Sequence, residues 1–219
     1  MLKNLKFLKT HPKASRDISS RLVDKSKYRD ISLEFGEMYF DGPREYGYGG
    51  YVYDGRWLSI AQEIISHYDL KPGDRVLDVG CAKGFLVRDL LFSCPGLNIF
   101  GLDVSTYAIK NCHPDVIGRL HLGNATSLPF PDNSFKLALS INTIHNLGLE
   151  DCKTAINEIQ RVSPDNSFIQ VDSYRNEAEL AAFEDWMLTA KSYFKPEEWL
   201  EIFSSLGFTG DYDWTIVEG

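Results

Sequence analysis

An acidic residue followed by alternating small residues is the strongest chemical signal in the chain. Asp78 ends an apolar run, and Gly80, Ala82 and Gly84 follow it before Phe85 opens another apolar run. Small residues let a backbone approach a ligand closely, and the start of a helix offers free N–H groups. The turn is therefore predicted to hold a nucleotide-like cofactor. A dinucleotide-binding turn would place its third glycine at Phe85, which argues against NAD.

This segment resembles motif I of the class I S-adenosylmethionine (SAM)-dependent methyltransferases, usually written D-x-G-x-G-x-G. Asp78, Gly80 and Gly84 match the motif, and Ala82 stands at its middle glycine. Alanine is small enough for the turn to survive. Lys83 occupies a variable position of the motif and is expected to be structural or solvent-facing.

Further segments match the same family in order and spacing. Asp103, followed by Val104, resembles the acid at the end of the second strand, where a carboxylate accepts hydrogen bonds from ribose hydroxyls. Asn124 and Ala125 resemble the segment that holds adenine, through an amide side chain and a backbone N–H. The resemblance implies SAM as cofactor and these cofactor-binding residues: Asp78, Gly80, Ala82, Gly84, Asp103, Val104, Asn124, Ala125 and Asn142.

The segment that contains Asn142 and His145 resembles the stretch after the fourth strand that meets the methyl donor and acceptor. His145 is expected to act as general base for a hydroxyl acceptor, since an unperturbed histidine pKa of about 6.5 suits proton abstraction. Asp172, at the end of the fifth predicted strand, could orient the acceptor. Either side chain could instead serve a structural role, His145 by capping a helix or bonding inside its loop and Asp172 by capping a turn.

Glycines alternate with aromatic residues over residues 39–57, a pattern that fits no regular element and predicts a shaped loop. In the methyltransferases that the chain resembles, the segment before motif I often folds over SAM as a lid. Tyr48, with glycine on both sides, is expected to be exposed toward the site. Its ring could pack there on the sulfonium of SAM or on the acceptor, because aromatic faces attract cations. The stretch, together with a later Leu-Thr-Ala-Lys segment that ends at Lys191, resembles a bacterial methyltransferase subfamily. That resemblance implies a small polar metabolite or a polysaccharide sugar as acceptor, with Tyr48, Asp172 and Lys191 near it.

The elements that position these residues alternate in type after residue 75. Short apolar runs predict strands at 76–79, 98–102, 120–122, 137–141, 168–171 and 214–217, with helical patterns between most of them. Such alternation predicts an α/β fold: a doubly wound, largely parallel, six- or seven-stranded Rossmann-like sheet. Residues 1–219 are expected to form a single domain, with an N-terminal helical cap or lid over residues 1–56 and a SAM-binding core over residues 57–219.

Composition excludes several classes of protein. The net charge of −8 argues against a general nucleic-acid binder, although residues 1–30 hold nine lysines and arginines against three aspartates. No apolar run approaches the roughly 20 residues of a membrane span, so no stable membrane insertion is expected. The four cysteines form no C-x-x-C pair, and no Asp, Asn and His cluster is spaced for a metal, so no metal is assigned. These features favour a cytoplasmic protein.

The sequence therefore predicts a SAM-dependent methyltransferase that acts on a small molecule, at oxygen rather than nitrogen. One alternative is a nucleic-acid or protein methyltransferase, but the chain contains neither Asn-Pro-Pro-Tyr nor a Pro-Cys pair. The other alternative is a SAM-binding protein without turnover. The sequence does not determine the oligomeric state or the identity of the acceptor.

Overall fold

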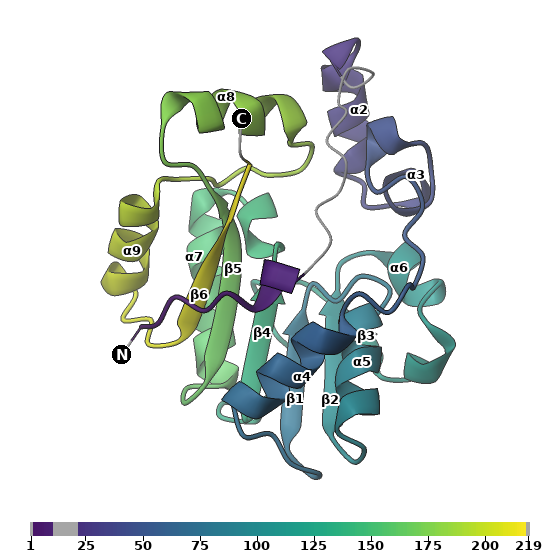
Figure 1. The fold of residues 1–219 in the computed structure, drawn as a ribbon, viewed down its shortest axis with the longest axis vertical. Coiled ribbons are helices and arrows are strands. Elements are labelled where there is room, and N and C mark those ends of the chain that lie inside the picture. The colour runs from purple at the N-terminus through teal and green to yellow at the C-terminus, as the bar shows by residue number, and fades with distance from the viewer. Residues whose placement is uncertain (1, 11–21, 218–219) are drawn as a thin grey trace.

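A computed structural model describes residues 2–10 and 22–217, and within them six parallel strands form one sheet (Figure 1). The strand order is β3-β2-β1-β4-β5-β6. The chain thus builds outward from β1 to β3 and then crosses over to β4 on the other side of β1. In open α/β sheets, ligands bind at such a reversal, outside the carboxyl ends of the strands. The strands are β1 Arg75–Val79, β2 Asn98–Asp103, β3 Leu120–Leu122, β4 Leu137–Ile141, β5 Ser167–Ser173 and β6 Asp211–Ile216.

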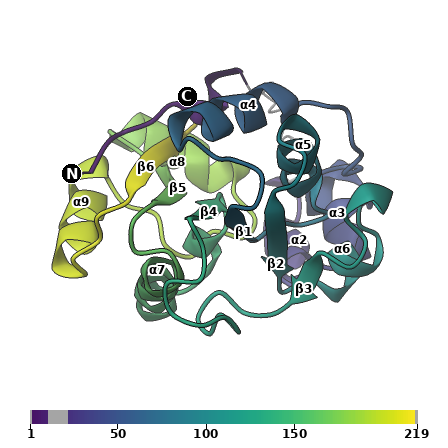
Figure 2. The ribbon, with the colours of Figure 1, turned by 90° about the horizontal axis from the view of Figure 1, so that it is seen from below.

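Helices cover both faces of the sheet (Figure 2). The helices α4 (Leu58–His67) and α5 (Phe85–Ser93) pack on one face, and α7 (Leu149–Val162) and α9 (Pro196–Ser205) pack on the other. Strands buried on both faces are largely apolar, which is why β1 and β4 appear in the sequence as mostly apolar runs. This arrangement confirms the predicted doubly wound α/β fold.

A roof stands over the carboxyl ends of the strands and is built from two distant parts of the chain (Figure 1). One part is N-terminal, with α2 (Lys25–Ser32), α3 (Glu37–Phe40) and the 3-10 turn η2 (Arg44–Tyr46); the other is α8 (Glu177–Trp186) and the segment after it. Arg29 of α2 joins the two parts, because its guanidinium donates to the Ala190 carbonyl over 2.8 Å. The predicted N-terminal helices are therefore present over the site.

The first described residues lie on the sheet rather than in the roof. The Leu5 N–H donates to the Tyr212 carbonyl over 2.8 Å, and Phe7 at the start of η1 (Phe7–Thr10) is buried against Phe168. This short N-terminal piece covers the outer edge of β6, so it packs with the core and not with the cap predicted for residues 1–56. Much of the predicted basic N-terminal segment, residues 11–21, lies outside the described residues.

The remaining described elements are short. They are α6 (Thr106–Lys110), η3 (Pro114–Val116) and η4 (Ile144–Asn146). The η4 turn follows β4 directly and carries His145, so a tight turn rather than a helix positions the predicted base.

Candidate functional site

A cavity of about 1580 Å³ lies between the roof and the carboxyl ends of the strands. Single-ligand sites usually measure roughly 300–1,000 Å³, so this cavity has room for a cofactor and an acceptor together. All but one of the predicted site residues line it: Asp78, Gly80, Ala82, Asp103, Val104, Asn124, Ala125, Asn142, His145, Asp172, Tyr48 and Lys191.

Gly84 is the predicted site residue outside the cavity lining. It caps the start of α5 with φ +76°, and a Cβ there would come within 2.9 Å of the Leu120 and Val116 side chains. Gly84 therefore permits close packing beneath the turn. It does not line the cavity in which the cofactor is expected to bind.

Gly80 packs tightly against the segment that follows β4. Its φ is +86°, and a Cβ would lie 2.0 Å from the Thr143 hydroxyl oxygen. The motif thus brings β1 and β4 together at the point where the strand order reverses. A side chain here would disturb the fold itself, so replacing Gly80 cannot separate cofactor binding from folding.

Asp103 ties the turn to the end of β2. One carboxylate oxygen accepts the Ala82 N–H and the other accepts the Ser105 N–H, each over 2.8 Å. Burial raises the pKa of Asp103, although these backbone hydrogen bonds oppose the shift. The Val104 N–H also donates to this carboxylate. Three backbone donors leave part of its roughly four acceptor positions for a ligand hydroxyl.

Asp78 presents a buried carboxylate to the same cavity. Burial, together with the nearby charge of Asp103, raises its pKa to about 7. None of the described residues donates a hydrogen bond to it, and its side chain faces the cavity from the centre of the sheet. Such a carboxylate fits a cationic group, which would supply the missing partner.

The far end of the cofactor region lies beside β2 and β3. Val104 is exposed, Ala125 is buried, and the Asn124 side-chain oxygen accepts the Thr126 N–H over 3.0 Å. The amide of Asn124 is thereby fixed in place at the cavity wall, where an adenine ring is expected.

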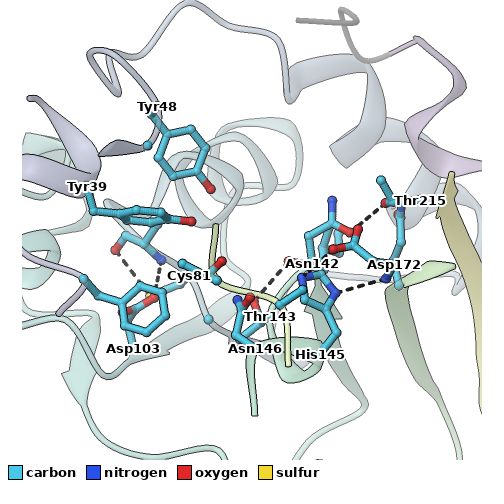
Figure 3. A pocket seen from close by; sticks show the side chains of 18 of the residues that line it. Tyr39, Tyr48, Cys81, Asp103, Asn142, Thr143, His145, Asn146, Asp172 and Thr215 are labelled. Atoms are coloured by element: carbon cyan, nitrogen blue, oxygen red, sulfur yellow. Dashed lines mark hydrogen bonds and ion pairs between the residues drawn. The ribbon is translucent and has the colours of Figure 1, made fainter. Parts of the chain in front are cut away.

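His145 and Asp172 form a closed pair in which both ring nitrogens are used (Figure 3). The Asp172 N–H donates to His145 Nδ1, and His145 Nε2 lies 3.1 Å from the Asp172 carboxylate. Burial lowers the pKa of His145 to about 3, so the ring is neutral with its proton on Nε2. A histidine in this state has no free nitrogen with which to accept a proton, and the predicted role of general base does not fit.

Both residues of this pair are held firmly by their backbones. The Lys191 and Ser192 N–H groups donate to the His145 carbonyl, each over 2.9 Å, and Trp199 Nε1 donates to the Asp172 carbonyl over 3.0 Å. The exposed Lys191 therefore contributes a backbone contact behind the site, with its side chain at the rim of the cavity.

Asn142 turns away from the predicted cofactor position. Its side-chain oxygen accepts a hydrogen bond from the Thr215 hydroxyl over 2.7 Å, and the Gln170 amide donates to the Thr215 oxygen over 2.9 Å (Figure 3). The chain of hydrogen bonds runs across the ends of β4, β5 and β6. The sequence analysis missed Gln170, although a glutamine within the apolar run of β5 was a visible signal.

Tyrosines from the N-terminal segment face the cavity from the roof (Figure 3). Tyr39 and Tyr48 meet edge to face with ring centroids 5.2 Å apart, and Tyr48 and Tyr51 lie 4.4 Å apart. Burial raises the pKa of Tyr39, hydrogen bonds with Thr189 and Tyr48 oppose this shift, and the charges of Asp103 and Asp172 add to it. Tyr48 was predicted here, whereas Tyr39 was not, because no spacing rule relates it to the core.

Lys83 joins the cofactor turn to the roof. Its buried ammonium lies 2.7 and 2.6 Å from the two Asp41 carboxylate oxygens and 3.1 Å from the Tyr51 carbonyl. The Tyr107 hydroxyl also donates to Asp41, over 2.7 Å. Burial alone would raise the pKa of Asp41, but the hydrogen bonds from Lys83 and Tyr107 lower it overall. Lys83 is thus structural and buried rather than solvent-facing.

The described residues also bear on metal binding and membrane insertion. No group of three or more His, Cys, Asp or Glu side chains among them could hold a metal ion. None of the described helices combines the length and apolar character needed to cross a membrane.

The sequence of this chain is similar to those of known methyltransferases. Residues 77–169 match the family model described as a methyltransferase domain. Demethylmenaquinone methyltransferase of Symbiobacterium thermophilum is 34% identical over 90 residues, which cover 37% of this chain and 36% of that protein. Sterol 24-C-methyltransferase of Schizosaccharomyces pombe is 28% identical over 160 residues, which cover 65% and 41%. The chain thus matches well under half the length of these curated relatives.

Solved structures show the same fold at low sequence identity. The putative methyltransferase in complex with the Haloferax volcanii Trm112 activator has a TM-score of 0.54 at 16% identity, covering 89% of this chain and 77% of that one. The YcgJ protein of Bacillus subtilis has a TM-score of 0.53 at 19% identity, covering 67% and 66%. Together these matches show that residues 77–169 resemble a methyltransferase domain and that the chain shares the fold of these solved structures. The bacterial subfamily stays a prediction.

Proposed function

We propose that this protein transfers a methyl group from SAM to an oxygen of a small polar acceptor. The observation that carries the proposal is that the turn at Asp78 and Asp103 opens into the same cavity as the Asp172–His145 pair. One end of the cavity fits the cofactor, and the other holds a carboxylate suited to an acceptor.

The cofactor end offers a set of groups that fits SAM. Asp78 would hold the ammonium of its methionine part, Asp103 would accept the ribose hydroxyls, and Asn124 with Ala125 would hold adenine. SAM supplies a methyl group already activated by its sulfonium. The protein therefore has to bind and align the two partners and exclude water.

Asp172 replaces His145 as the group that receives the acceptor proton in this proposal. The neutral His145 donates its Nε2–H to one Asp172 oxygen and so fixes the carboxylate at the cavity wall. A carboxylate held in this way can accept the proton of a bound hydroxyl as that oxygen becomes methylated. His145 acts through Asp172 and is a positioning residue.

The roof would exclude water from the site. Tyr39 and Tyr48 cover the space between Asp103 and Asp172 (Figure 3), and Arg29 holds the two parts of the roof together. Excluding water strengthens the electrostatic interactions inside the cavity and protects the methyl donor from hydrolysis.

The test is release of S-adenosylhomocysteine (SAH) from SAM in the presence of fractionated small-molecule extract, with total tRNA and a protein fraction as separate arms. We expect SAH only with the small-molecule fraction, and much less SAH from Asp103→Ala at the same sub-saturating SAM concentration. Turnover with tRNA or with protein would contradict a small-molecule acceptor and identify a nucleic-acid or a protein acceptor instead. Tight SAM binding without release in any arm would leave a SAM-binding protein.

A further inference from the structure

A row of polar side chains lies beside the Asp172–His145 pair, on the face of the sheet that the N-terminal piece covers. The register pairs Gln170 with Asp213 and Asp172 with Thr215 across β5 and β6. Residues paired in register point to the same side of a sheet, so these four side chains form one patch. All four line the cavity. We call them the β5–β6 polar row.

The hydrogen bonds within the row use the Thr215 hydroxyl and one of the two N–H groups of the Gln170 amide. The Gln170 amide donates to the Thr215 oxygen, and the Thr215 hydroxyl donates onward to Asn142. The Gln170 side-chain oxygen, which can only accept, takes no part in this chain. That oxygen is fully buried and has no partner among the described residues, in a side chain that is 3% exposed.

Asp213 adds a second acceptor on the neighbouring strand. Its carboxylate is buried, and Lys6 reaches it from the N-terminal piece over 2.6 Å. The Lys6 side chain is 60% exposed, so it covers Asp213 from the solvent side and can yield to a ligand. Adjacent strands lie about 4.8 Å apart, which sets the spacing between the two acceptors.

We propose that the β5–β6 polar row binds the part of the acceptor that is not methylated, and that this part carries several O–H or N–H donors. The inference rests on the proposed function and deepens it. Asp172 would meet the reacting hydroxyl, while Gln170 and Asp213 would accept hydrogen bonds from neighbouring donors of a compact hydroxylated or amino-substituted ring. An apolar ring in the same place would leave the Gln170 oxygen buried without a partner, which sites of this kind reject strongly.

The experiment uses Gln170→Met, which keeps the size of the side chain and removes its oxygen. The probes are glucose, glucosamine and menadione, each tested by saturation-transfer NMR with the full chain saturated with SAH. Glucose or glucosamine should bind and menadione should not. In Gln170→Met the bound sugar should weaken about tenfold, the loss of one hydrogen bond, at unchanged SAH affinity. Gln62→Met, on the exposed face of α4, is the matched control and should bind as wild type.

A second variant separates the two kinds of donor and covers the case in which Gln170→Met does not fold. Asp213→Asn removes the charge and keeps the shape, so glucosamine should weaken more than glucose. The proposal is overturned if neither sugar binds, if menadione binds instead, or if sugar binding is unchanged in both variants. Failure of SAH itself to bind would overturn the proposed function, whereas SAH binding without sugar binding would overturn this inference alone.

Discussion

The charged form of Asp78 lowers the stability of the ligand-free fold but is the form expected to bind a cationic ligand. Its folded-state pKa of about 7 lies above the ordinary value of 3.8, so the group stabilises the fold below about pH 4, and this contribution is lost as the pH rises through 7. At neutral pH the protein thus keeps a carboxylate that costs stability. A cationic ligand would reverse that cost by favouring the charged form.

We therefore expect Asp78→Asn to stabilise the ligand-free protein at pH 8, by about 1–3 kcal/mol, and to weaken SAH binding. The stability gain should vanish at pH 4, where the wild-type carboxyl is largely protonated. Thermal melts at the two pH values, with calorimetry for SAH, provide the measurement. A variant less stable than wild type at pH 8 would show that Asp78 has a structural partner.

We expect variants of Asp172 and His145 to change turnover and its pH dependence in different ways. Asp172→Asn should lower turnover by about 10²–10⁴-fold at unchanged SAH affinity, since it removes the proton acceptor and keeps the shape. The pH profile of the wild type should show no histidine limb, because burial lowers the pKa of His145 to about 3. A limb near the ordinary histidine pKa that disappears in His145→Ala would restore His145 as the base.

For single residues, the sequence predicted where His145 lies but not its protonation or its role. Its place after the fourth strand follows from the order of motifs, whereas its protonation depends on the Asp172 N–H and carboxylate, which come from another strand. The same limit applies to Lys83 and Asp41, since side chains so far apart in the sequence show no pattern that pairs them.

Among the elements, the cofactor turn and the roof are coupled through hydrogen bonds and ring contacts. Lys83 leaves the turn and ends on Asp41 and Tyr51, while the Ser105 hydroxyl donates to the Phe35 carbonyl over 2.6 Å. A change in the position of the turn should therefore also move the roof above it.

Strands and helices of the core were predicted well because apolar periodicity decides them. The strand β6 begins three residues earlier than predicted, since the polar residues Asp211 and Asp213 break the apolar pattern at its start.

Breaking this coupling should loosen the roof while the core stays folded. Lys83→Met leaves the partly buried Asp41 without its cation, which should cost about 1–3 kcal/mol and weaken SAH binding. Hydrogen exchange over residues 37–51 should accelerate, with little change in β1 and β4. Lys110→Met, at the exposed end of α6, serves as control. Equal exchange over residues 37–51 in Lys83→Met and wild type would contradict the coupling.

For the molecule as a whole, the site arises from the order of the strands. The reversal between β1 and β4 brings Asp78 and Asp103 to one side of the cavity and Asp172 to the other, and the two-part roof covers both. Alternating elements were enough to predict this sheet. The β5–β6 polar row could not be predicted, because it depends on a register between two strands and on an N-terminal piece that returns to the sheet.

The central claim is that the turn and the end of β2 together bind the cofactor. Calorimetric titration of SAH into wild type and Asp103→Ala tests it most directly. We predict one site with micromolar affinity in the wild type, and in the variant a loss of about 1.5–3 kcal/mol, as expected when a hydrogen bond to a charged acceptor is removed. The same affinity in both proteins, or no binding to the folded wild type, would contradict the account.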